Sequence, residues 1–89
     1  MKRHQGDLIE SDTIKIKVLV TLGDGEFHTP SELASQFHTS SKTIQRNAAF
    51  LALMGLVTVE TRVAKQKITY LKVTQSGIET LKRIRAAKP

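Results

Sequence analysis

The chain has 89 residues and no cysteine, and its 14 Lys and Arg against 8 Asp and Glu give a formal net charge of +6. This length suffices for one domain with a small core. Because such a small domain is only marginally stable by itself, oligomerisation is one way in which the chain could gain stability. The lack of cysteine excludes disulfides, thiolate zinc sites and cysteine nucleophiles. Residues 48–57 form the longest apolar run, which is too short to span a membrane, and no signal peptide follows Met1. We therefore expect a cytoplasmic protein without a membrane partner.

The charge is unevenly distributed along the chain. Residues 1–32 contain four basic and six acidic residues, a balance of −2, whereas residues 33–89 contain ten basic and two acidic residues, a balance of +8. A one-sided basic surface attracts polyanions, of which nucleic acid is the commonest in a cell. We expect residues 1–11 to form a flexible arm and residues 12–89 to form the folded domain.

The first predicted element spans residues 12–22, where the pattern fits two structures. Alternating β-branched residues favour a strand. A helix would instead place three apolar side chains on one face: Ile14, Val18 and Leu22. We predict the helix, because Ser11 or Asp12 provides an N-cap and glycines follow its end. The helix leaves Ile16 and Val20 on a second apolar face that requires a partner.

A very short strand is predicted at residues 26–28, followed by a capping box at Thr29-Pro30-Ser31-Glu32. In such a box the Thr29 hydroxyl accepts a hydrogen bond from the Glu32 amide, and the Glu32 carboxylate reaches back to the N-cap. Pro30 takes the first helical position, where its missing N–H has no cost. The box predicts a short helix that ends near Phe37.

Ser40 is the expected N-cap of a longer helix over residues 41–54. One face of this helix is apolar: Ile44, Ala48, Leu51 and Met54. After Gly55 the apolar period changes from 3.6 to 2, which predicts a hairpin over residues 56–62 and 67–73. Thr74 then caps a last helix with apolar residues at Ile78, Leu81 and Ile84. The order of helix, short strand, helix, helix, hairpin and helix defines an α+β fold.

Residues 29–57 resemble the helix-turn-helix of winged-helix regulators of the MarR, PadR and ArsR kind. The resemblance rests on Leu33-Ala34 in the first helix, on Ser40 followed by Thr43-Ile44-Gln45-Arg46, and on the closing pattern from Leu51 to Val57. The hairpin is similar to the wing of that family, and residues 70–77 resemble its exit from strand to helix. The likeness covers about residues 13–85 and implies a winged helix-turn-helix fold that binds double-stranded DNA.

The outward face of the helix at residues 41–54 is expected to enter the DNA major groove. On this face Gln45 suits pairing with adenine and Arg46 pairing with guanine. Side chains near the helix N-terminus suit phosphates: Ser40, Ser41, Lys42 and Thr43. The wing adds three cations for the minor groove or the DNA backbone: Arg62, Lys65 and Lys67. The alternative for both elements is a solvated charged surface.

Phe50 and Leu53 lie on the outward side of the helix at residues 41–54, where a solvated helix would carry charge. Together with Ile16, Val20 and Leu81 they are expected to form a homodimer interface, and two-fold dimers suit inverted half-sites in DNA. An ordinary core position for Phe50 is the alternative.

The function expected from the sequence is a sequence-preferring DNA-binding protein, a small transcriptional regulator associated with the nucleoid. One alternative is a plasmid-partition or chromosome-coating protein that spreads along DNA, and another is a winged-helix module that binds protein. No enzyme is expected, because His4, His28 and His38 lack metal-ligand spacing and no nucleophile is paired with a base. No cofactor or metal is expected either.

Overall fold

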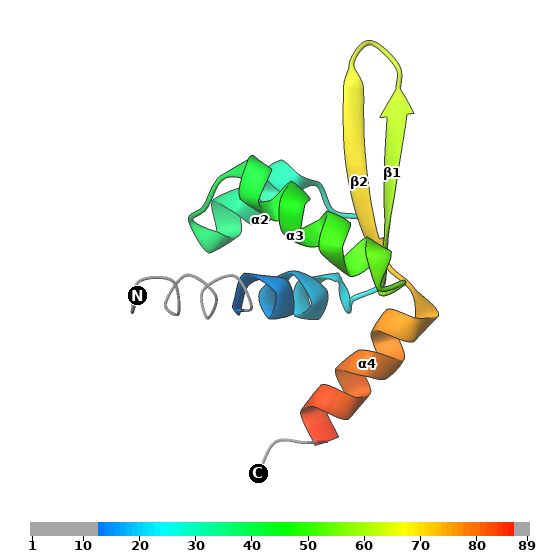
Figure 1. Ribbon diagram of the computed structural model, residues 1–89. Helices are drawn as coiled ribbons and strands as arrows, with labels where there is room; N and C mark the ends of the chain where they lie inside the picture. Colours follow the sequence, from blue (N-terminus) through cyan, green and yellow to red (C-terminus); the bar gives the residue numbers. More distant parts are fainter. Residues whose placement is uncertain (1–12, 87–89) are drawn as a thin grey trace.

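The structure is a computed structural model that describes residues 13–86, so the predicted arm at residues 1–11 lies outside the described residues. An N-terminal helix, described over residues 13–22, is followed by α2 (Pro30–Phe37), α3 (Ser41–Leu53), β1 (Val57–Val63), β2 (Lys67–Val73) and α4 (Gln75–Ala86) (Figure 1). The predicted α+β order is confirmed. In Figure 1 the hairpin rises from the helices, and α4 leaves its base in the opposite direction.

The N-terminal segment is a helix, as predicted. The apolar side chains that it buries on one face explain why it forms a helix and not a strand. Val18 and Leu22 are fully buried and Leu19 is 3% exposed, so one face of the helix enters the core. The alternation of β-branched residues would have required a neighbouring strand to bury the same side chains. Ile16 and Val20 remain half exposed on the opposite face.

Local capping sets the ends of α2 and α3. The Thr29 hydroxyl accepts from the Glu32 N–H at 3.1 Å, which confirms the first half of the capping box. The second half differs, because the Glu32 carboxylate contacts His28 Nδ1 at 2.5 Å. His38 ends α2 in the left-handed conformation, with φ 57°. The Ser40 hydroxyl then accepts from the Thr43 N–H at 3.1 Å, as predicted for the cap of α3.

The predicted strand at residues 26–28 is reduced to one bridge between His28 and Leu71. The His28 N–H donates to the Leu71 carbonyl at 2.9 Å, and the Leu71 N–H donates to the His28 carbonyl at 2.7 Å. Since β2 pairs with β1 on its other edge, the bridge makes β2 the central strand of a small antiparallel arrangement. The segment before α2 is thereby fixed to the base of the hairpin.

The register of the hairpin separates its two faces. Val57 pairs with Val73 and Val59 pairs with Leu71, so these residues share the face that meets the helices. We call the face that meets the helices the inner face of the hairpin. Between the base and the tip, three pairs of residues lie on this face: Val59–Leu71, Thr61–Thr69 and Val63–Lys67. The outer face carries the alternate pairs: Thr58–Lys72, Glu60–Tyr70 and Arg62–Ile68.

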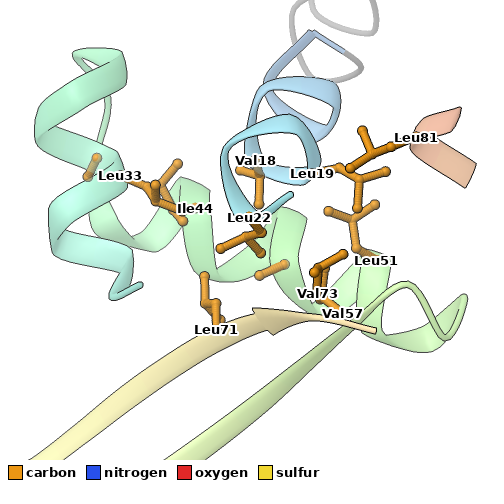
Figure 2. Close-up of a cluster of buried hydrophobic side chains, with 12 residues drawn as sticks. Val18, Leu19, Leu22, Leu33, Ile44, Leu51, Val57, Leu71, Val73 and Leu81 are labelled. Atoms are coloured by element: carbon orange, nitrogen blue, oxygen red, sulfur yellow. The ribbon is translucent and has the colours of Figure 1, made fainter. Parts of the chain in front are cut away.

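The core lies where the helices meet the base of the hairpin (Figure 2). It contains twelve buried apolar residues drawn from every element, with Leu22, Leu33, Ile44 and Leu71 among the fully buried ones. Met54 is an exception to the predicted buried face, because α3 ends at Leu53 and Met54 is 51% exposed at the C-cap. Asn47 is also buried on the face of α3 that was predicted as apolar, which the sequence pattern did not indicate. Its Nδ2 donates a hydrogen bond to the Thr43 carbonyl at 2.8 Å.

Gly77 allows α4 to approach the base of the hairpin closely. A Cβ at this position would lie 2.6 Å from Val73 Cγ2 and against the Leu56 carbonyl oxygen, which is backbone and cannot rotate away. Gly77→Ala is therefore expected to lower the free energy of unfolding by about 2 kcal/mol, although alanine in an open helix would raise it. Urea unfolding should show this loss, whereas Ser76→Ala at the adjacent exposed position should not. Equal stability of both variants would contradict the close packing.

Candidate nucleic-acid interface

The polar face of α3 is exposed as the sequence predicted. Lys42, Gln45, Arg46 and Ala49 are exposed, while the opposite face is buried against α2 and the hairpin. The side chains of Gln45 and Arg46 make no hydrogen bond or ion pair within the described part of the chain. They are therefore available to a ligand outside the protein.

The N-termini of α2 and α3 meet at the same edge of the molecule, where the Ser31 and Ser41 hydroxyls are 3.3 Å apart. Ser40 and Thr43 are occupied by capping, with their hydroxyl oxygens 2.9 Å apart. The N-terminal ends of both helix dipoles, which carry partial positive charge, therefore lie close together at this edge. Lys42 adds a full positive charge near the N-terminus of α3. Such an arrangement favours an anion such as a phosphate group.

A polar hollow of about 380 Å³ separates α3 from the hairpin and opens beside these helix ends. It is lined from three elements by Thr29, Ser31, Gln45, Gln66, Lys67 and Thr69. Of these residues, only Gln45 and Lys67 were predicted from the sequence as DNA contacts. Ser31 belongs to the capping motif and Gln66 and Thr69 to the hairpin, so no local pattern indicated that they would face α3.

The cations predicted for the wing lie on different sides of the hairpin. Lys65 is exposed in the turn at its tip, and Lys67 is exposed on the inner face beside the hollow. Arg62 lies on the outer face, with its guanidinium 4.8 Å from the ring centroids of both Phe27 and Tyr70. Its Nη2 also donates to the Glu60 carboxylate at 3.0 Å. The structure therefore places Lys67 beside the hollow, Lys65 at the tip of the hairpin and Arg62 on the opposite face from Lys67.

His28 lies between two carboxylates just before α2. Its Nε2–H donates to Asp24 at 2.9 Å and its Nδ1–H donates to Glu32 at 2.5 Å, which requires the doubly protonated ring. Partial burial alone lowers the pKa of His28, but the hydrogen bonds to Glu32 and Asp24 outweigh it and raise the pKa above the usual value. The Glu26 N–H, followed by the His28 ring, lowers the pKa of Asp24.

These shifts predict a limited pH range of greatest stability. The raised pKa of His28 means that its stabilisation is complete below the unfolded value near 6.5 and is lost as pH rises through the folded pKa. The lowered pKa of Asp24 means that its own stabilisation is lost as pH falls through the folded value. His28→Asn is expected to cost about 1 kcal/mol at pH 6 and much less at pH 9.

Urea unfolding at a series of pH values checks this prediction. His38→Asn is the matched control, because among residues 13–86 no carboxylate lies within ion-pair distance of His38, and asparagine tolerates its left-handed backbone. A His28→Asn deficit that stays constant from pH 6 to pH 9 would argue against the protonated ring.

A second surface, on the N-terminal helix and the end of α3, is apolar. Ile16, Val20, Phe50 and Leu53 are 49%, 45%, 50% and 87% exposed, and the Lys15 ammonium lies 4.8 Å from the centroid of the Phe50 ring. We call these four residues the apolar surface. A mostly apolar groove of about 330 Å³ adjoins them and is lined by residues that include Ile16, Leu19, Leu51, Met54, Leu56 and Ile84.

Leu81 differs from the other residues predicted for a dimer interface. It is 3% exposed, because it packs inside the protomer beside Leu19 at the end of the core cluster (Figure 2). Phe50 is half exposed, so the alternative of an ordinary core position does not describe it. The four residues of the apolar surface remain available to a partner.

The arrangement of acidic and imidazole side chains offers no metal site in the part of the chain that the structure describes. Over residues 13–86 no three His, Asp or Glu side chains come together in a way that would hold a metal ion. Within the same range no helix is both long and apolar enough to span a membrane.

Comparison with known proteins finds no matching family model and no matching curated protein, but it does find solved structures of the same fold. A transcriptional regulator homologue from Pyrococcus horikoshii OT3 has a TM-score of 0.76 at 18% identity over 83% of this chain and 74% of that chain. A MarR family regulator from Neisseria meningitidis has a TM-score of 0.68 at 18% identity over 83% of this chain. The match covers 52% of the Neisseria regulator, about half its length.

The transcriptional regulator HlyU from Vibrio vulnificus CMCP6 has a TM-score of 0.63 at 19% identity over 100% of this chain and 95% of that chain. At these identities the likeness establishes the fold, which is the winged helix-turn-helix that the sequence resemblance implied. The three structures are described as regulators or a regulator homologue.

Proposed function

We propose that this chain is a sequence-preferring double-stranded DNA-binding protein that acts as a small transcriptional regulator at the nucleoid. One observation carries the proposal: the exposed face of α3, the paired helix N-termini and the inner face of the wing converge on one polar hollow. No acidic side chain lines this hollow, and Lys67 does line it. Lys42 and Arg46 are exposed on α3, and Lys65 is exposed in the turn of the hairpin. A polyanion with a regular backbone fits that distribution of charge.

The residues divide by the part of DNA that each would contact. α3 would lie in the major groove, with Gln45 and Arg46 at base edges and Lys42 at a phosphate. Ser31 and Ser41 mark the place where the helix N-termini would receive a backbone phosphate, and the engaged hydroxyls of Ser40 and Thr43 would hold that end of α3 in place. Lys65 and Lys67 would lie over the adjacent minor groove or backbone.

The apolar surface supports a homodimer as the functional unit. Four large apolar side chains exposed on neighbouring helices are unusual for a small monomer, and a second copy would cover them. A two-fold dimer would present two α3 helices to inverted half-sites about one helical turn apart.

Selection of bound duplexes from a random pool, followed by footprinting at several protein concentrations, tests the function. A regulator should select an inverted repeat and protect a bounded site. A partition or chromosome-coating protein would instead give a periodic footprint that lengthens with concentration. Recovery of no duplex above background would favour the protein-interaction module and would contradict the proposal.

A further inference from the structure

The hairpin is supported by the core only at its base. Val57, Leu71 and Val73 are buried there, whereas every residue of β1 after Val57 is exposed. Among residues 13–86, the backbone bridge from the segment before α2 reaches the hairpin at Leu71 and no nearer to the tip. A two-stranded hairpin is only marginally stable by itself. A further contact is therefore needed to fix the orientation of the half of the hairpin near the tip relative to the helices.

Arg62 supplies such a contact on the outer face. Its guanidinium lies 4.8 Å from the ring centroid of Phe27, in the segment before α2, and 4.8 Å from that of Tyr70, in β2. The two rings meet edge to face, 6.0 Å apart at 76°. Lys72 Nζ lies 4.9 Å from the Phe27 centroid, so a second cation holds the same ring against the hairpin. Cations over aromatic faces are attracted by the ring quadrupole.

Glu60 orients the guanidinium from the same strand, with a carboxylate oxygen 3.0 Å from Nη2. The side chains of Arg62 and Glu60 are 53% and 50% exposed, so the ion pair alone would stabilise the hairpin little. Together with the two rings, however, it fixes one orientation of a planar group. A lysine would carry the charge to this position but could not fill the planar site.

We propose that Arg62 is a positioning residue of the wing, which clamps the hairpin to the segment before α2 and does not itself contact DNA. Phe27 lies two residues before Thr29, the N-cap of α2, so the clamp couples the angle of the wing to the helix-turn-helix. The register supports this role, because Arg62 and Lys67 lie on opposite faces of the hairpin. The inference rests on the proposed DNA-binding function.

The salt dependence of DNA binding distinguishes clamping from contact. Removing one phosphate contact makes the slope of log Kobs against log salt shallower by about 0.9. Arg62→Gln is expected to weaken binding to every duplex about fivefold, the factor for one exposed cation–π contact, and to leave the slope unchanged. Lys65→Gln at the wing tip is the control and should make the slope shallower. A shallower slope for Arg62→Gln would overturn the proposal.

Tyr70 gives a second readout that needs no DNA, because it is the only tyrosine and the chain has no tryptophan. Tyrosine emission of the free protein should change in Arg62→Gln and in Phe27→Leu, and should be unchanged in Lys65→Gln. If Arg62→Gln leaves the emission unaltered, the clamp does not form. Should the wild type bind no duplex, the proposed function fails, but this measurement still decides whether the clamp exists.

Two further variants distinguish a clamp from a phosphate contact. Arg62→Lys keeps the charge but loses the planar group that contacts both rings, so it should weaken binding without changing the salt slope if Arg62 is a clamp, and should resemble the wild type if Arg62 is a phosphate contact. It also serves as the test if Arg62→Gln fails to fold. The Phe27→Leu and Arg62→Gln double variant should lose less binding free energy than the sum of the two single losses, and additive effects would contradict a shared clamp.

Discussion

Arg46→Ala is expected to weaken binding to the selected duplex by about 1–3 kcal/mol, or roughly 5- to 150-fold, while binding to random duplexes changes far less. The reason is geometric. Arg46 is exposed on the free face of α3, and its planar guanidinium can donate two parallel hydrogen bonds to one guanine. A contact of this kind distinguishes bases, whereas a contact to phosphate does not.

Lys65→Gln is the matched comparison, because it removes a cation of the wing from outside the α3 face. It should weaken binding to selected and random duplexes alike and make the salt dependence shallower. Binding measured by fluorescence anisotropy on both duplexes at several salt concentrations checks the pair. If the two variants affect selected and random duplexes equally, the assignment of base reading to α3 and backbone binding to the wing is wrong.

The features that the sequence predicted well are those determined by residues close together in the chain. The Thr29 and Ser40 caps act on amides three residues later, so both appear in the structure with hydrogen bonds of 3.1 Å. The change of period after Gly55 located the hairpin to within a residue at each end. The exposed positions on α3 followed from helical spacing alone.

The features that it did not predict depend on segments brought together by the fold. Glu32 was expected to complete a capping box, but its carboxylate contacts the His28 ring instead. Arg62 was expected at DNA because it is basic and lies in the hairpin. Its partner Phe27 comes from a segment far away in the sequence, and no local pattern indicates that contact. The meeting of Ser31 with Ser41 has the same origin.

Leu53→Glu is expected to convert the protein from dimer to monomer at micromolar concentration without loss of fold. Leu53 is 87% exposed in the protomer, so a carboxylate there is solvated in the monomer and its folding cost is small. In a dimer closed over the apolar surface, the same carboxylate would be buried without a partner. We expect the dissociation constant to rise by at least about 30-fold, the effect of a hot-spot residue.

Sedimentation equilibrium measures the change, and Gln36→Glu, at an exposed position on α2, is the control for added charge. The consequence for DNA follows from symmetry. A monomer of Leu53→Glu retains α3 and the wing, so it should bind a single half-site as the wild type does. It should lose the added affinity for two half-sites one helical turn apart, because that affinity depends on linking the two α3 helices. A wild type that sediments as a monomer at high micromolar concentration would contradict the dimer.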